Sequence, residues 1–185
     1  MRLIDPSLCV LLVLAVTVPS QAQSRGGVMG DLLADVTAAE TKIVALAKAM
    51  PASTYDWRPA PGVRSTGEVL IHVAGDNYYM PVLLGGKAPA ETGIDIERRH
   101  ESVEAFEKRA MTRDQIVAEL ENSFRFLKQA MNETLDASLE EQAKFERRKV
   151  STRRFWIATT SHLHEHLGQL IAYARSNKVT PPWSR

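Results

Sequence analysis

Cysteine is almost absent from this sequence, because Cys9 is the only one in 185 residues. It lies inside an apolar N-terminal run rather than at the end of that run, where a lipid-anchored cleavage site would need it. Beyond this run the chain can form no disulfide and has neither a cysteine nucleophile nor a cysteine ligand for zinc. A chain without thiols tolerates an oxidising compartment.

Neither sign of charge prevails, because 23 Lys and Arg residues stand against 22 Asp and Glu residues. A net charge of +1 gives no electrostatic reason to expect nucleic acid or an anionic membrane as a partner. The sequence also lacks a glycine-rich phosphate loop, a serine nucleophile elbow and a basic stripe interleaved with aromatic residues. We therefore expect no nucleic-acid partner, and a small molecule as the substrate.

Long hydrophobic runs are also rare, and the one at Leu8–Val18 has the length of a signal-peptide core but is short for a membrane span. Ser20 and Ala22 supply the small residues that a signal peptidase needs. We predict a signal peptide over residues 1–22 and a secreted or periplasmic protein with no stable membrane insertion after cleavage. An uncleaved N-terminal anchor is the alternative. The remaining residues, 23–185, suit one compact domain.

The rest of the chain has the apolar spacing of amphipathic helices. Two helix starts show the capping-box spacing, in which a Ser or Thr and a Glu or Gln three residues later satisfy each other's free backbone amides. These are Ser65 with Glu68 and Thr112 with Gln115. The pattern predicts four long helices, over residues 28–50, 66–84, 112–131 and 152–176.

No segment has a convincing strand pattern, and residues 85–111 and 135–150 are expected to be connections with at most a short helical turn. Four long helices with one long second connection are typical of a helix bundle. We therefore predict an all-α fold, an up-down-type four-helix bundle.

Three histidines are the strongest candidates for a functional site. His162 and His166 are four residues apart, which on a helix puts both on one face, about 6 Å apart along the axis. His72 faces inward from the predicted second helix, as metal sites in helix bundles require. We expect His164 to point away from this face and His100 to be solvated in its charged segment.

A histidine pair at this spacing is by itself a weak signal, because such pairs are more often partly buried or surface residues than metal ligands. A third imidazole from another helix favours a metal site between the second and last helices. Neutral imidazoles suit zinc, nickel, copper or iron(II), and three protein ligands leave a position for water or substrate. The expected cofactor is a divalent metal ion, with zinc first and nickel second.

Four segments carry a resemblance to a known family: Trp57–Pro61, Gly67–Ala74, His162–Leu170 and Tyr173–Arg175. In this combination and order the sequence resembles the DinB-like superfamily, over essentially the whole chain beyond the leader.

The resemblance implies a four-helix bundle with a divalent metal held by three histidines, which in this sequence are His72, His162 and His166. Some members of the superfamily are thiol S-transferases that use low-molecular-weight thiols, others are mycothiol-dependent isomerases, and many have no assigned reaction. Leu167 stands where members usually have a charged residue, and we expect this departure to affect the surface rather than the ligands.

Three further residues are candidates for supporting the histidines or binding substrate. Asp76, one turn beyond His72, could accept a ring N–H, although a solvated carboxylate at the bundle mouth is an equal alternative. Gln169 could bond a ligand histidine or make a structural bond between helices. Glu165 could serve as a base, but an exposed helix face is the more common setting for such a residue.

Two classes of function remain open. The first is a secreted, divalent-metal-binding protein that works as a metal-dependent enzyme, a transferase or a hydrolase, on a small molecule. The second is a non-catalytic bundle in which the histidines stabilise the fold or the protein binds a ligand or partner. An apolar-ligand carrier is a third class. Export argues against thiol transfer, since low-molecular-weight thiols are chiefly intracellular. A homodimer is compatible with such a bundle, although no interface can be identified from the sequence.

Overall fold

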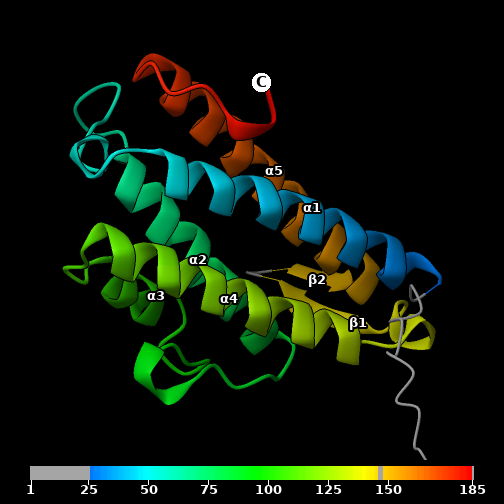
Figure 1. The fold of residues 1–185 in the computed structure, drawn as a ribbon. Helices are drawn as coiled ribbons and strands as arrows, with labels where there is room; N and C mark the ends of the chain where they lie inside the picture. Colours follow the sequence, from blue (N-terminus) through cyan, green and yellow to red (C-terminus); the bar gives the residue numbers. More distant parts are fainter. Residues whose placement is uncertain (1–25, 146–147, 185) are drawn as a thin grey trace, which may run out of the picture.

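The computed structural model describes residues 26–145 and 148–184, and the predicted signal peptide lies outside these residues. Five α-helices and a pair of strands follow one another along the chain (Figure 1). In chain order, these are α1 (Val28–Ala49), α2 (Thr66–Leu83), α3 (His100–Glu107), α4 (Arg113–Glu133), β1 (Gln142–Phe145), β2 (Arg148–Ser151) and α5 (Thr152–Ser176). Short 3-10 turns lie at Ala52–Thr54, Ala90–Thr92, Asp136–Ser138 and Pro182–Ser184.

The four long helices pack around one hydrophobic core. Helix α1 packs against α4 and α5, and α2 packs against the same two helices, which closes a ring of contacts (Figure 1). The short α3 lies against α2. The all-α expectation is therefore confirmed as a mostly helical fold. The largest fully buried side chains come from all four long helices and include Ile43, Leu70, Phe124, Phe155 and Trp156.

Both predicted capping boxes are present. The Ser65 hydroxyl accepts from the Glu68 amide while the Glu68 carboxylate accepts from the Ser65 amide, and Thr112 and Gln115 do the same at the start of α4. Each pair satisfies amides that a helix start would otherwise leave free. The first box matters for the site, because it fixes where α2 begins and therefore which of its residues face α5.

The start of α1 is held by a distant carboxylate. Asp136 accepts hydrogen bonds from the backbone amides of Val28, at 2.8 Å, and Met29, at 3.2 Å. Gly27 precedes the helix with φ of 86°, a left-handed conformation that favours glycine. The connection between α4 and β1 thereby anchors the beginning of the described chain.

The expectation of no strands was wrong. β1 and β2 pair antiparallel, with Ala143 opposite Val150 and Phe145 opposite Arg148. Only Ala143 is buried in this pair, and the Phe145 ring packs edge-on against Phe155 of α5. Four-residue strands rich in charge have too little alternation to be recognised by pattern. Tertiary packing against α5 and α2 stabilises the hairpin instead.

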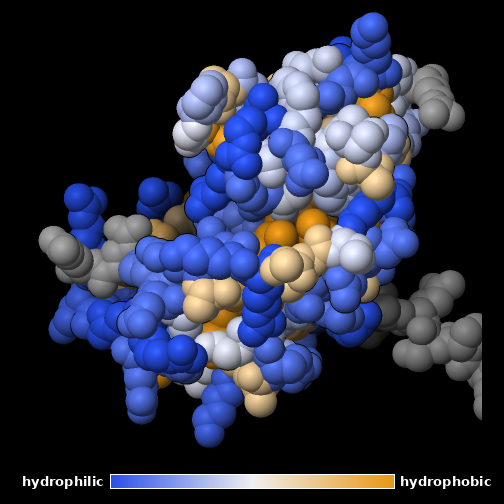
Figure 2. Space-filling view, turned by 90° about the vertical axis from the view of Figure 1, so that its left-hand side faces the viewer, coloured by the Kyte–Doolittle hydropathy of each residue, from blue (hydrophilic) through white to orange (hydrophobic). Residues whose placement is uncertain are grey.

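Within the described ranges, no helix combines the length and the apolar character needed to cross a membrane. Hydrophilic residues dominate the face shown in Figure 2, where hydrophobic residues appear only in small separate patches.

Candidate metal site

The three predicted histidines converge from two helices. His72 comes from α2, and His162 and His166 come from α5, and their ligand nitrogens lie within 4.8 Å of one another. The Nε2 atoms of His162 and His166 are 3.0 Å apart. Two ligands of a tetrahedral zinc ion, each about 2.0 Å from the metal, are separated by roughly 3.3 Å. The spacing of the nitrogens is therefore close to that of a metal-ligand set.

The outer nitrogens of two rings are engaged by acceptors. His72 Nδ1 lies 2.6 Å from Glu107 Oε1, and His166 Nδ1 lies 2.9 Å from Gln169 Oε1. An acceptor at Nδ1 places the proton of a neutral imidazole there and leaves the Nε2 lone pair free. Both rings are thus held with Nε2 directed to the common point.

Arg64, in the loop before α2, connects these two supports. Its guanidinium lies 3.3 Å from Glu107 Oε2, and its carbonyl accepts a 3.1 Å hydrogen bond from the Tyr173 hydroxyl. Gln169 in turn donates to that hydroxyl at 2.9 Å. The ring of Trp57 packs edge-on against Tyr173, with centroids 5.2 Å apart. The loop therefore positions the supports of histidines on two different helices.

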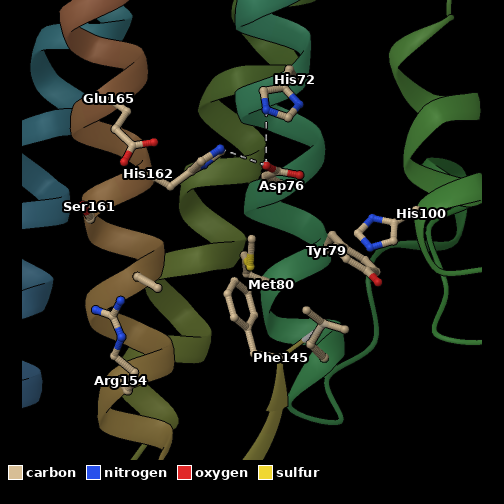
Figure 3. Close-up of a pocket in the computed structure, with 12 residues that line it drawn as sticks. His72, Asp76, Tyr79, Met80, His100, Phe145, Arg154, Ser161, His162 and Glu165 are labelled. Carbon is tan, nitrogen blue, oxygen red and sulfur yellow. Dashed lines mark ion pairs between the residues drawn. The ribbon is translucent and has the colours of Figure 1, made fainter. Parts of the chain in front are cut away.

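Asp76 lies at the centre of the site. Its Oδ2 is 3.5 Å from Nε2 of both His72 and His162 (Figure 3). One helical turn separates Asp76 from His72, which is why both project from the same face of α2. The carboxylate is placed to serve as a fourth donor to a cation or to accept a proton from a bound molecule.

The two imidazoles of α5 are in the protonation state that a metal requires. Burial, reinforced by the neighbouring His166 and His72, lowers the pKa of His162 to about 4. Burial also lowers the pKa of His166, although its hydrogen bond with Gln169 acts in the opposite direction. Both rings are therefore neutral near pH 7, and neutral imidazole is the form that coordinates metals.

The two carboxylates differ in their electrostatic setting. Burial raises the pKa of Asp76, with the charge of Glu107 adding to the effect and that of His72 opposing it. Burial opposes ionisation of Glu107 too, but its bonds with His72 and Arg64 outweigh it and lower its pKa.

The donor set suits a divalent cation. In the part of the chain that the structure describes, no Lys or Arg nitrogen lies within 4 Å of the Asp76 carboxylate, and only 16% of its side chain is exposed. A mostly buried carboxylate is costly unless a cation compensates it. Three imidazoles with one carboxylate match the ligands that zinc, nickel or iron(II) accept.

A cavity of about 380 Å³ opens from the histidines along α5 (Figure 3). Its position leaves one side of the histidine cluster accessible to a small molecule. Its lining comes from α2, α3, β1 and α5: His72, Asp76, Tyr79, Met80, Leu83, His100, Phe145, Arg154, Ala158, Ser161, His162 and Glu165.

The remaining candidates from the sequence are placed as follows. Gln169 bonds His166, which is the first of the two roles considered for it, and its second bond, to Tyr173, lies within α5 rather than between helices. Glu165 is exposed and lines the cavity. His164 points away from the site, toward Asp35, as expected. His100 is exposed, yet it also lines the cavity.

Two residues that support the histidine cluster were missed by the sequence analysis, and one expectation was wrong. Glu107 and Arg64 carry no periodic or motif signal, and only the packing of α3 and the loop reveals them. Leu167 does not lie on the surface, because it is 5% exposed and belongs to the core. An apolar residue replaces the usual charge there because this face of α5 is buried.

A family model described as the DinB superfamily matches residues 36–170. Similar solved structures include a DinB-like protein from Bacillus cereus, with a TM-score of 0.64 and 18% identity over 84% of this chain and 95% of that one. A DinB-like protein from Bacillus subtilis has a TM-score of 0.61 and 15% identity over 81% and 94%.

A third similar structure is a mycothiol-dependent maleylpyruvate isomerase, with a TM-score of 0.60 and 14% identity over 78% of this chain and 61% of that one. Comparison with curated proteins found no match. The structural likenesses concern the fold, whereas the family match spans most of the sequence and includes all three site histidines. The chain belongs to the DinB superfamily.

Proposed function

We propose that this protein holds a divalent metal ion through His72, His162 and His166 and is a metal-dependent enzyme, of transferase or hydrolase type, acting on a small molecule. The observation that carries the proposal is the convergence of these three imidazoles beside an accessible cavity. Zinc is the first candidate for the metal and nickel the second.

Four residues around the histidines would orient the ligands, balance charge or transfer a proton. Glu107 and Gln169 orient the imidazoles, and Asp76 balances the positive charge of the cation. Glu165, on the cavity wall, is available to accept a proton from a bound molecule. A divalent cation at this point would supply Lewis acidity to an oxygen or sulfur atom of the substrate.

The choice between transferase and hydrolase chemistry stays open. The structural likeness to a mycothiol-dependent isomerase supports a role for a thiol co-substrate. The signal peptide predicted from the sequence argues against this role, because an exported protein would meet few low-molecular-weight thiols. The proposal therefore places the protein in the secreted or periplasmic compartment, with residues 1–22 removed and no nucleic-acid partner. A homodimer is compatible with it.

We further propose that α1, α2, α4 and α5 form an up-down four-helix bundle. The closed ring of packing among these helices supports this description. In a bundle of this kind, metal sites are built from side chains on facing helices, as α2 and α5 provide here.

Elemental analysis of the purified protein, with His162→Ala and His164→Ala variants, tests the proposal. His164 is a matched control, because it lies on the same helix and turns away from the site. We expect a stoichiometric metal in wild type and in His164→Ala, and its loss in His162→Ala. If wild type retains no metal and added zinc or nickel does not raise its melting temperature, the metal site does not exist.

Chelation then separates the enzyme from a structural module. If the metal-free protein keeps its helical circular dichroism and a cooperative thermal transition, the metal is available for chemistry. If metal removal unfolds the chain, the histidines serve the fold, and the enzymatic part of the proposal is wrong.

A further inference from the structure

The cavity beside the histidines has a cation at its far end. Arg154 lies two turns before His162 on the same face of α5, about 12 Å away along the helix axis at 1.5 Å per residue. Its guanidinium extends along α5 toward Ser161 (Figure 3). An arginine fork in this position can bind both oxygens of a carboxylate.

A second hollow, of about 680 Å³, adjoins the first and shares Tyr79, Leu83 and His100 with it. No described residue in its lining is acidic. The charged residues of its lining are all basic, namely Arg99, Lys144 and Arg148.

Unlike two neighbouring arginines, the cations of the two hollows have no carboxylate partner among the described residues. Arg153 pairs with Glu140, and Arg98 pairs with Asp95. Over residues 26–145 and 148–184, no carboxylate lies within 4 Å of Arg154 or Arg99, nor of Lys144 or Arg148. Among the described residues, the guanidinium of Arg154 therefore faces the cavity without a carboxylate partner.

Negative and positive side chains lie at opposite ends of the cavity. Both carboxylates of the lining, Asp76 and Glu165, belong to the histidine end. Between that end and Arg154 the wall is largely apolar, with Met80, Leu83 and Phe145 contributing to it. A ligand complementary to this arrangement has an anionic group at one end and an apolar body.

We propose that the cavity binds a small amphipathic organic anion whose carboxylate contacts Arg154 and whose apolar body lies against Met80, Leu83 and Phe145. The molecule then extends toward the three histidines, so that its uncharged end is the part presented to the metal. This last step rests on the proposed function, whereas binding of the anion to Arg154 does not. The adjoining basic hollow attracts such anions and leads them to the cavity.

Calorimetric titration of the folded protein with 4-phenylbutyrate tests the proposal, with the uncharged 4-phenylbutyramide as the matched ligand. Metal-free protein is used, so that the carboxylate cannot bind a metal instead. We expect Arg154→Gln to weaken 4-phenylbutyrate binding about tenfold or more, the effect of losing a charge-assisted hydrogen bond. Acetate, which lacks the apolar body, should bind at least tenfold more weakly than 4-phenylbutyrate.

Arg153→Gln is the control variant, since it removes the same charge from the adjacent position without touching the cavity. It should leave the affinity for 4-phenylbutyrate unchanged, and the amide should bind wild type and Arg154→Gln equally weakly. The proposal is overturned if 4-phenylbutyrate binding does not depend on Arg154, or if the amide binds as well as the carboxylate. Melting curves of both variants verify that each is folded.

The two proposals can fail separately. If 4-phenylbutyrate binding depends on Arg154 but the protein retains no metal, the anion site exists and the metal centre does not. If the protein holds a stoichiometric metal but binds 4-phenylbutyramide and 4-phenylbutyrate equally, the metal centre exists and its substrate belongs to a different class.

Discussion

Glu107 Oε1 lies 2.6 Å from His72 Nδ1, and so α3 holds the one histidine that α2 contributes to the site. The two residues are 35 positions apart, and Arg64 contacts the other carboxylate oxygen. Carboxylate, imidazole and metal in this order form a common support for metal ligands, because the acceptor fixes both the tautomer and the orientation of the ring.

Replacing Glu107 should weaken metal binding without removing a ligand. We expect Glu107→Leu to reduce zinc affinity by roughly 10- to 100-fold, because His72 loses its acceptor. Glu107→Gln should have a smaller effect, since its amide oxygen can still accept from Nδ1. Competition with a fluorescent zinc chelator measures both affinities.

The control for this series is Glu104→Gln, on the same short helix. Glu104 is exposed and pairs only with Lys108 among the contacts described. It should retain the zinc affinity of wild type. An unchanged affinity in Glu107→Leu would show that Glu107 does not orient His72.

Asp76→Asn should have opposite effects on the metal-free and metal-loaded proteins. Without a bound metal, burial disfavours the Asp76 carboxylate, so a neutral amide of the same shape should leave the melting temperature unchanged or raise it. With zinc present, the variant lacks the compensating charge, and we expect zinc affinity to fall by about tenfold. Differential scanning calorimetry with and without zinc gives both quantities.

Asp35→Asn is a suitable comparison, because Asp35 is an exposed carboxylate beside His164, outside the site. Its zinc-induced shift in melting temperature should equal that of wild type. A metal-free Asp76→Asn protein that melts several degrees below wild type would mean that Asp76 stabilises the fold rather than a cation.

Stability at alkaline pH should depend on Tyr55. Its hydroxyl donates a 2.7 Å hydrogen bond to the Ala47 carbonyl, and burial raises its pKa to about 12, although the nearby Arg113 opposes the shift. Below pH 10 the phenol is neutral in both states and its contribution is complete. As pH rises from 10 to 12, the unfolded chain releases this proton first, so the contribution is lost.

Urea unfolding of wild type and Tyr55→Phe at pH 8, 10 and 11.5 measures this contribution. Between pH 8 and 11.5, we expect the unfolding free energy of wild type to fall more than that of the variant, by on the order of 1–2 kcal/mol. The other tyrosines titrate in both proteins, so their effect cancels when the two unfolding free energies are subtracted. Parallel pH profiles would contradict the prediction.

The convergence of the three site histidines could be predicted from the sequence because their placement depends on local helix geometry. A separation of four puts His162 and His166 on one face, and the capping box at Ser65 sets the start of the helix that carries His72. The same reasoning placed Asp76 near His72. These inferences required only helix spacing and the assumption that the two helices face each other.

The parts that could not be predicted depend on contacts between distant segments. Glu107 is one acid in a charged stretch, and nothing local distinguishes it from its exposed neighbour Glu104. The strands at 142–151 are too short and too charged to show alternation, and they are stabilised by packing on α5. Leu167 was assigned to the surface because its position was judged by a family pattern rather than by its own apolar character.

Gly27 and Asp136 meet at the start of α1. Asp136→Ala removes the acceptor from two amides at the start of α1, and we expect it to lower the unfolding free energy by about 1 kcal/mol. Gly27→Ala should also destabilise the protein, because its Cβ would lie 2.0 Å from Asp136 Oδ2 and φ is 86°. Chemical denaturation of each variant measures both losses.

The double variant identifies the cause of the Gly27→Ala loss. Once Asp136 is alanine, the added methyl group no longer meets a carboxylate, so only the backbone strain at residue 27 remains. We therefore expect the loss in the double variant to be smaller than the sum of the single losses, by about 0.5 kcal/mol or more. Strict additivity would show that the two residues do not interact in solution. Asp56→Ala, at an exposed carboxylate remote from this junction in sequence, should change the unfolding free energy by less than about 0.5 kcal/mol.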